Sequence, residues 1–348
     1  MKRDQLLEAI GGIDEQYLLE TEQIACPRGR KVRRFVLAAA IVAALSITVA
    51  ASTGILSGLL KGKDNGSTVA NLSTGMGSFV YSDNAIYSGE PGHIYKYDLE
   101  GKLLKTYKLD SEQESPMYMF ATKDAIVYVD SYNKLMVLPK NGTQAKQVAA
   151  GISMTFVYVD GTYLYTTEGT EMLTRIDLVT GEATRLLENV NTYYIDDTYI
   201  YAVQPGEGSY YFRSPKDTVA FEKIPLDFEP NKVIADGQDL YFCQWVEEDL
   251  REDSNMRYRV NLVSNGKTTQ LPVYSWFYQV LDGCVLYLED GTCCVRCYDL
   301  QTGETRLLQE NVFEFSVLED RYICFDLYNQ APVVYDWETG GSVALTAE

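Results

Sequence analysis

A unit of about 40 residues recurs seven times between residues 78 and 346, and this repeat constrains the fold of the 348-residue chain more than any other feature. Each unit has an apolar strand ending in tyrosine, a loop, a second strand ending in an Asp-Leu-x-x-Gly turn, and a short basic and apolar strand. The clearest turns lie at 97–101, 176–181 and 298–303. A repeat of this length with several strands per copy is typical of a β-propeller blade.

Alignment on the second of four antiparallel strands predicts seven blades over residues 78–348. Six or eight blades are alternatives, because the fourth unit has Ser214-Pro215-Lys216-Asp217 in place of the turn. A small sheet cannot bury both of its faces alone, whereas a ring of sheets covers them. The aligned second-strand positions are Tyr87, Tyr128, Tyr165, Tyr201, Tyr241, Tyr287 and Cys324. The turn glycines, each expected to supply a positive φ, are Gly101, Gly142, Gly181, Gly266, Gly303 and Gly340.

Composition indicates a sheet-rich and acidic body. The 27 tyrosines fit strands, where an aromatic ring packs on a half-buried pleated surface. Residues 35–348 hold 23 basic and 43 acidic side chains, a net charge of −20. Such a surface repels nucleic acid and anionic lipid, and it favours cationic partners or simple solubility.

Residues 35–60 contain no charged side chain and predict a transmembrane helix. Five basic residues lie between Arg28 and Arg34, just before this segment, and only Lys61 and Lys63 follow closely. The positive-inside rule therefore predicts cytoplasmic residues 1–34, a flexible linker over 61–77 and an extracytoplasmic propeller. A cleaved signal peptide is the alternative, although 34 residues before the apolar run are long for one.

The segment 1–34 predicts two short helices separated by Gly11-Gly12. Helices this short are marginal alone, so their apolar stripe is expected to dock on a cytosolic protein or on the membrane surface. A plain topogenic tail is the alternative. The residues of the expected partner face are Leu6, Ile10, Ile13, Tyr17 and Ile24.

Two resemblances accompany these patterns. Residues 7–15, with the following basic cluster and single span, resemble the N-terminal segment of many single-pass proteins of Gram-positive, clostridial-type bacteria. Some proteins of that layout resemble membrane-bound anti-sigma factors, which implies a cytosolic protein partner. The Asp-Leu-x-Thr-Gly-Glu turn resembles the blades of quinoprotein-like and WD-like propellers. The tryptophan that commonly follows this turn in quinoprotein repeats is missing, so no quinone cofactor is implied.

The sequence offers no specific catalytic or metal signature. The single histidine, His93, begins the third strand of the first unit and is expected to lie in a loop or to pack against neighbours. Acidic pairs are too numerous for sequence alone to select the two carboxylates of a glycosidase. We therefore expect a protein without a metal or a cofactor, and not an enzyme.

The cysteines predict one disulfide. Asp290-Gly291 is a strong signal for a two-residue hairpin, which would pair Glu289 with Thr292. This register places Cys284 opposite Cys297 at a distance suitable for a disulfide. Two free buried thiols are the alternative.

Connections in a four-stranded meander alternate between the two faces of the ring, so the loops after second and fourth strands share one face. The sequence predicts a recognition or sensing module that binds an unidentified ligand, peptide or wall polymer through this face. A surface carbohydrate-active enzyme and a structural adaptor of an envelope complex are the alternatives. The candidate ligand-binding residues are Tyr132, Glu168, Glu207, Trp245, Glu248, Asp253 and Tyr328.

Overall fold

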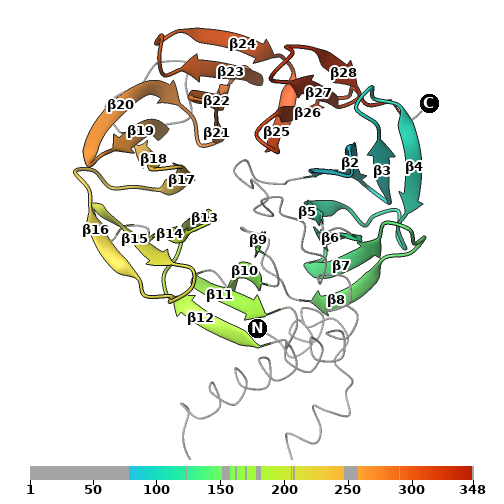
Figure 1. Cartoon of the computed structure of the whole chain (residues 1–348), viewed down its shortest axis with the longest axis horizontal. Helices are drawn as coiled ribbons and strands as arrows, with labels where there is room; N and C mark the ends of the chain where they lie inside the picture. The colour runs from blue at the N-terminus through green and yellow to red at the C-terminus, as the bar shows by residue number, and fades with distance from the viewer. Residues whose placement is uncertain are drawn as a thin grey trace, which may run out of the picture. The chain divides into compact units, whose positions relative to one another are not determined.

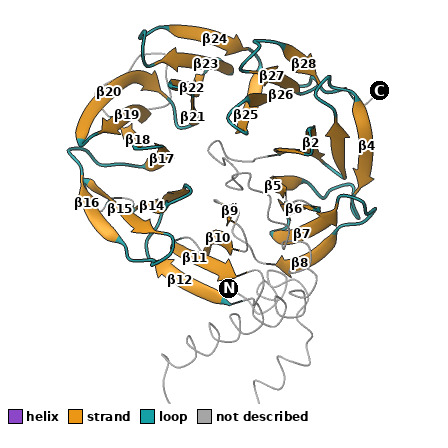
Figure 2. Ribbon diagram, viewed as in Figure 1, coloured by secondary structure: helices purple, strands orange, loops and turns teal. Residues whose placement is uncertain are grey.

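The computed structural model describes residues 78–121, 124–150, 157–160, 163–168, 171–177, 182–204, 206, 208–246, 258–289 and 291–346. Within them, seven four-stranded antiparallel sheets form a ring (Figure 1, Figure 2). The prediction of an all-β propeller with seven blades is confirmed. The segments 1–34, 35–60 and 61–77 lie outside the described residues, and no helix in the described part is long and apolar enough to cross a bilayer.

Each blade uses four strands that are consecutive in the chain, here called A to D in order. The first three blades are β1 (Phe79–Ser82), β2 (Ala85–Glu90), β3 (His93–Tyr97) and β4 (Leu103–Lys108); β5 (Pro116–Ala121), β6 (Ala125–Asp130), β7 (Lys134–Pro139) and β8 (Lys146–Ala150); β9 (Val157–Asp160), β10 (Tyr163–Glu168), β11 (Met172–Asp177) and β12 (Ala183–Leu187).

The other four blades complete the ring, and the A strands lie innermost while the D strands form the rim (Figure 1). They are β13 (Thr192–Ile195), β14 (Tyr199–Val203), β15 (Tyr210–Pro215) and β16 (Glu222–Pro225); β17 (Lys232–Asp236), β18 (Asp239–Trp245), β19 (Tyr258–Ser264) and β20 (Lys267–Tyr274); β21 (Tyr278–Leu281), β22 (Cys284–Glu289), β23 (Cys294–Asp299) and β24 (Thr305–Gln309); β25 (Val312–Leu318), β26 (Tyr322–Leu327), β27 (Val333–Asp336) and β28 (Ser342–Ala344).

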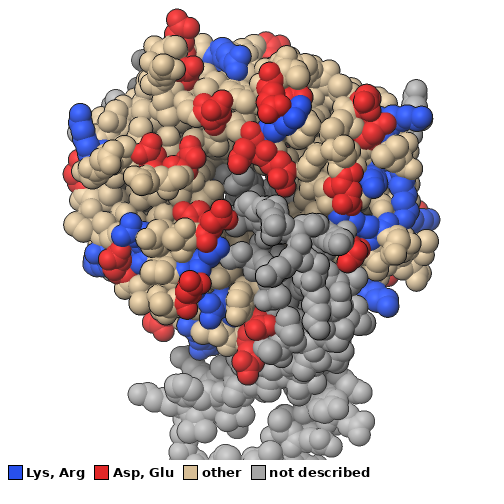
Figure 3. Space-filling model, viewed as in Figure 1, with Lys and Arg blue, Asp and Glu red and all other residues tan. Residues whose placement is uncertain are grey.

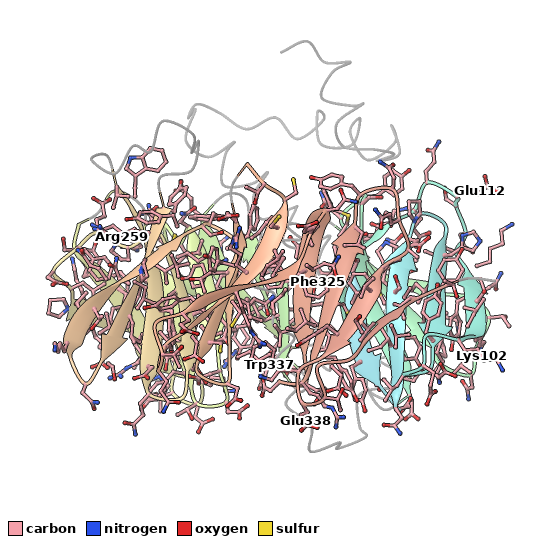
Figure 4. The ribbon with its side chains drawn as sticks, turned by 90° about the horizontal axis from the view of Figure 1, so that it is seen from above. Lys102, Glu112, Arg259, Phe325, Trp337 and Glu338 are labelled. Atoms are coloured by element: carbon pink, nitrogen blue, oxygen red, sulfur yellow. The ribbon has the colours of Figure 1, made fainter. Side chains whose placement is uncertain are left out.

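The connections alternate between two faces, as the meander predicts. The B–C face carries the B–C loops and the inter-blade D–A loops, which bond to one another: Gly92 N–H donates to the Glu114 carbonyl, and Tyr328 N–H to the Asn311 carbonyl. The A–B face carries the A–B and C–D turns. Figure 4 shows the ring from the side, with Glu112 of a D–A loop at the upper face and Glu338 of a C–D turn at the lower face.

The repeat positions within the described residues are confirmed with two corrections, whereas Gly181 lies outside those residues. All seven aligned residues lie in B strands, but they do not end them: Tyr87 is the third of six residues in β2, because the strand continues to the B–C loop. The C–D turns are held by aspartates such as Asp299, whose carboxylate accepts the N–H groups of Gln301 and Thr302. Gly142 lacks the positive φ that its turn was expected to need.

Tyrosine fills the spaces between blades. The rings of Tyr158 in blade 3 and Tyr193 in blade 4 lie 5.1 Å apart between centroids, and both side chains are buried. Their hydroxyls cross the interface: Tyr193 donates to the Tyr165 carbonyl at 3.0 Å, and Tyr158 donates to the Tyr193 carbonyl at 3.3 Å. Such pairs bury a large ring without leaving its hydroxyl unsatisfied.

The first and last blades meet without sharing a strand. Residues after β28 run beside the first C–D turn, where Thr346 forms a parallel bridge with Lys102 and Leu345 is buried. Gly101 in that turn has a φ of 81°, and a Cβ there would overlap the Ala344 carbonyl oxygen. The contact of residues 343–346 with this turn and the apolar cluster around Leu345 therefore close the ring.

The predicted hairpin register at the cysteines is wrong. β22 and β23 pair Glu289 with Cys294 and Cys284 with Asp299, because the connection spans residues 290–293 with Cys293 at a φ of 52°. Cys284 and Cys297 are thus not directly opposite, and both are free thiols. Burial, and then a hydrogen bond with Cys297, raises the pKa of Cys284 to about 12.

We predict that Gly101→Ala lowers the melting temperature of the full-length protein more than Gly266→Ala does. Both glycines occupy C–D turns at positive φ, 81° and 73°, so both changes carry the cost of a left-handed residue, about 1–2 kcal/mol. A Cβ at Gly266 meets nothing within 4 Å, whereas one at Gly101 would overlap Val343 and the Ala344 carbonyl oxygen at the end of β28. If the two variants lowered the calorimetric melting temperature equally, the contact between the first C–D turn and the end of β28 would not be needed to hold the ring closed.

Candidate binding site on the B–C face

Three of the seven predicted ligand-binding residues are described with their side chains, and all three are exposed on the B–C face. Tyr132 follows β6, Trp245 ends β18 and Tyr328 follows β26. Glu168 is the last residue of β10, of which the backbone alone is described, and Glu207, Glu248 and Asp253 lie outside the described residues. Their role in binding stays a prediction.

Exposed aromatic side chains are concentrated on this face. Phe313, which the sequence analysis does not single out, is the second residue of β25 and joins the three residues above. The two other large exposed apolar residues in the described part, Leu104 and Leu307, are aliphatic and lie on the D strands of the rim. Exposed aromatic rings clustered on one face are typical of a recognition surface.

These aromatic residues form separate contacts. Trp245 lies edge-on to Tyr258, with 5.0 Å between ring centroids, and Tyr258 contacts Trp276 of the next D–A loop at 4.8 Å. Phe313 and Tyr328 meet edge-on at 5.4 Å in blade 7. The structure therefore brings the predicted residues to one face but not into one pocket.

A cavity of about 360 Å³ lies beside the Phe313 and Tyr328 pair, between blades 7, 1 and 2. None of the seven predicted residues lines it, although two predicted B–C loops, those after β2 and β26, contribute to it. The lining residues are Ser78, Phe79, Ser88, Gly89, Glu90, Pro91, Ser115, Pro116, Met117, Phe313, Glu314, Asp326, Gln330 and Pro332.

The blades approach one another closely at this cavity because Gly89 has no side chain. A Cβ at Gly89 would lie 2.7 Å from the sulfur of Met119 and 2.9 Å from Cβ of Pro116, both in blade 2. The glycine thus lets the end of β2 in blade 1 pack on the start of β5. A larger residue would push the two blades apart and open the cavity wall.

Three carboxylates face the cavity. Glu90 ends β2 of blade 1, whereas Glu314 of β25 and Asp326 of β26 are direct cross-strand partners in blade 7. Side chains of such partners lie on the same side of a sheet, about 5 Å apart at Cβ. The cavity therefore gathers carboxyl groups from the first and the last blade.

The electrostatics of the carboxyl groups reflect this crowding. Burial raises the pKa of Glu90 above its ordinary value, the charge of Asp326 adds to the rise, and His93 opposite Glu90 acts against it. Burial also raises the pKa of Asp326. Because a raised pKa means that the charged form is disfavoured, both groups cost stability once they ionise.

The A–B face carries a second acidic feature that sequence reasoning missed. An acidic residue precedes the aligned B-strand position of every blade by four or five residues, a regularity visible in the sequence. Figure 3 shows this face, with acidic groups around the inner ends of the blades. Burial, and then the charges of Asp320, Asp239 and Asp282, raises the pKa of Asp236. The residues are Asp83, Asp124, Asp160, Asp196, Asp236, Asp282 and Asp320.

The described part of the chain contains no group of three or more His, Cys, Asp or Glu side chains placed to hold a metal ion. His93, at the start of β3, stacks on Tyr95 with 5.5 Å between ring centroids, in agreement with the expected packing role.

Comparison with known proteins identifies the fold alone. No family model and no curated protein matches the sequence. Tricorn protease is similar at a TM-score of 0.56 and 11% identity over 82% of this chain, which spans 36% of the protease. The N-terminal domain of Nup159 is similar at a TM-score of 0.52 and 12% identity, over 78% of this chain and 89% of that domain. The WD40 domain of Neurospora crassa Pan2 is similar at a TM-score of 0.51 and 10% identity, over 73% of this chain and 86% of that domain. These likenesses support a propeller with WD40-like neighbours.

Proposed function

We propose that this protein is a membrane-anchored recognition module that binds an extracytoplasmic ligand, peptide or wall polymer through the B–C face. A β-propeller is generally a binding or scaffold module, and its loops vary while its blades stay fixed. The observation that carries the proposal is the concentration of exposed aromatic side chains on the B–C face, beside an acidic cavity.

The membrane anchor in this proposal is the uncharged segment 35–60, with the basic cluster before it on the cytoplasmic side. The acidic loop over 247–257, which contains Glu248 and Asp253, adds to the binding face in this proposal. A cytosolic protein partner would meet the apolar stripe of residues 1–34 and receive the signal of ligand occupancy. The stripe consists of Leu6, Ile10, Ile13, Tyr17 and Ile24.

We predict that Trp245→Ala and Tyr132→Ala each weaken binding to the ligands that full-length protein in detergent selects from a fixed array of peptides and glycans. Loss of an exposed aromatic contact at a recognition surface typically costs about tenfold in affinity. Leu307→Ala is the matched control, because Leu307 and Trp245 are both 44% exposed but lie on the rim and the B–C face respectively. Equal loss in the control, or no loss in the aromatic variants, would remove the B–C face from recognition.

The topology is testable with the natural cysteines. In intact bacterial cells that produce the full-length chain, a membrane-impermeant maleimide is expected to label the partly exposed Cys293 and Cys294 but not Cys26. Labelling should therefore vanish in the Cys293→Ala/Cys294→Ala variant and persist in Cys26→Ser. The reverse pattern would place the propeller in the cytoplasm and contradict the proposed orientation.

A second candidate function is glycoside hydrolysis in the cavity. One observation favours it: Glu90 and Asp326 both have raised pKa values and line the same cavity, and a glycosidase needs a carboxyl pair of which one is protonated near neutral pH. Full-length protein would then release reducing sugar from a glycan panel, and Glu90→Gln would abolish the release. Glycan binding without product would exclude this candidate.

A further inference from the structure

We propose that a second cavity, which lies between blades 4 and 5 and is here called the blade 4–5 cavity, binds a short neutral oligosaccharide. The turns 237–238 and 265–266 of blade 5 line it, so it belongs to the A–B side of the ring. The juxtaposition that carries the inference is a wall of tyrosine rings beside hydrogen-bonding side chains of both charge signs. The inference goes beyond the proposed function and does not rest on it.

The first step of the argument is the size of the cavity and the nature of its walls. Its volume is about 930 Å³, and the two blades that enclose it are neighbours in the ring (Figure 1). Tyr199 and Tyr201 of β14 and Tyr211 of β15 form the blade 4 side. Leu240 of β18 and Val263 of β19, which are cross-strand partners, form the blade 5 side. This volume is near the upper end of small-molecule sites and has room for about two or three sugar rings.

The second step concerns how the gaps between other blades are bridged. At three other junctions, a basic side chain of a C or D strand reaches the C–D turn of the next blade. Lys105 of blade 1 donates to two carbonyls of the turn in blade 2, and Arg175 of blade 3 donates to a carbonyl of the turn in blade 4. The guanidinium of Arg306 in blade 6 lies over the ring of Trp337 in the turn of blade 7.

Blade 4 departs from this arrangement. Arg213 lies opposite the aligned B-strand tyrosine of its blade, as Arg175 does in blade 3. Its Nε and Nη2 both donate to one carboxylate oxygen of Glu222 in the same blade, at 3.1 and 2.6 Å. The guanidinium also lies over the ring of Tyr199, 4.9 Å from its centroid. Arg213 is thus held within its own blade, and the cavity occupies the space between it and the C–D turn of blade 5.

The third step is the hydrogen-bonding character of the cavity. Among the described residues that line it, Arg213 and Lys267 are basic and Asp227 is acidic. The side chains of Gln238 and Asn265 lie on the two exposed turns that line it. A charged ligand would meet a like charge in such a site, whereas the hydroxyl groups of a neutral sugar both donate and accept hydrogen bonds. The C–H faces of the sugar rings would pack on the tyrosine rings.

The fourth step separates an oligosaccharide from a peptide. The strands that wall the cavity already pair their backbone groups within their own sheets, β14 to β16 in blade 4 and β18 to β20 in blade 5. A peptide inside the cavity would therefore bury backbone N–H and C=O groups that cannot join either sheet. A sugar has no such backbone and bonds to side chains through its hydroxyl groups.

The test is isothermal titration calorimetry of the full-length protein, in a detergent without a sugar headgroup, with cellotriose, chitotriose and mannotriose. At least one trisaccharide should bind. Gln238→Ala should weaken that binding about fivefold through loss of a hydrogen bond, and Tyr199→Ala at least tenfold through loss of a ring. Gln301→Ala is the matched control, because it removes an exposed amide from a turn of the same face in blade 6. It should leave the affinity within about twofold.

Gln238→Ala keeps the test decisive if Tyr199→Ala is unstable, because the Gln238 side chain is exposed and its loss should leave the melting temperature unchanged. Three results would overturn the inference. They are no heat of binding with any trisaccharide at millimolar concentration, equal weakening in Gln238→Ala and Gln301→Ala, and tighter binding of trialanine than of every trisaccharide, which would assign a peptide.

The outcome is distinguishable from that of the proposed function. Trp245 ends β18 at the B–C face and does not line the blade 4–5 cavity. If Trp245→Ala weakens no ligand of the peptide and glycan array, the proposed function fails, whereas trisaccharide binding that Gln238→Ala weakens still stands. If no trisaccharide binds but Trp245→Ala weakens array ligands, the inference fails and the proposed function stands.

Discussion

The structure depends on how neighbouring blades bury their faces against each other. Each sheet has only four strands, so most of its stability must come from side chains that it shares with the next blade. Tyrosine meets this need because its ring fills the wide gap between twisted sheets while its hydroxyl bonds to a carbonyl of the neighbour. Tyr158 and Tyr193 show both features, because their rings pack together between two blades and each hydroxyl donates to a backbone carbonyl. The abundance of tyrosine is therefore a property of the ring as well as of its strands.

A ring held together in this way fixes the positions of the loops on its two faces. The B–C face carries exposed aromatic rings at three separate places, and its cavity forms where the last blade meets the first two. Ring closure at that junction relies on the end of the last blade, which lies beside Gly101 of the first, and on an apolar cluster around Leu345. The same junction brings Glu90 within electrostatic reach of Asp326, whose charge adds to the effect of burial in raising the pKa of Glu90.

The sequence predicts the blade number, the aligned B-strand positions and the sharing of a face by two sets of loops, because all three follow from the period and from the alternation of a meander. It fails at the cysteine hairpin, where the left-handed Cys293 lengthens a turn that Asp290-Gly291 made look short. It also misses Glu314 and Asp326, because a repeat does not reveal which polar residue of a B or A strand points into a gap. The aspartates of the A–B turns, by contrast, recur four or five residues before each aligned B-strand position, so the sequence is sufficient to predict them.

A structure of the full-length protein with a ligand that it selects from the peptide and glycan array is the most direct test of this account. It should show the ligand in contact with the exposed aromatic rings of the B–C face, with the blades unmoved. Ligand density confined to the acidic turns of the A–B face would contradict it.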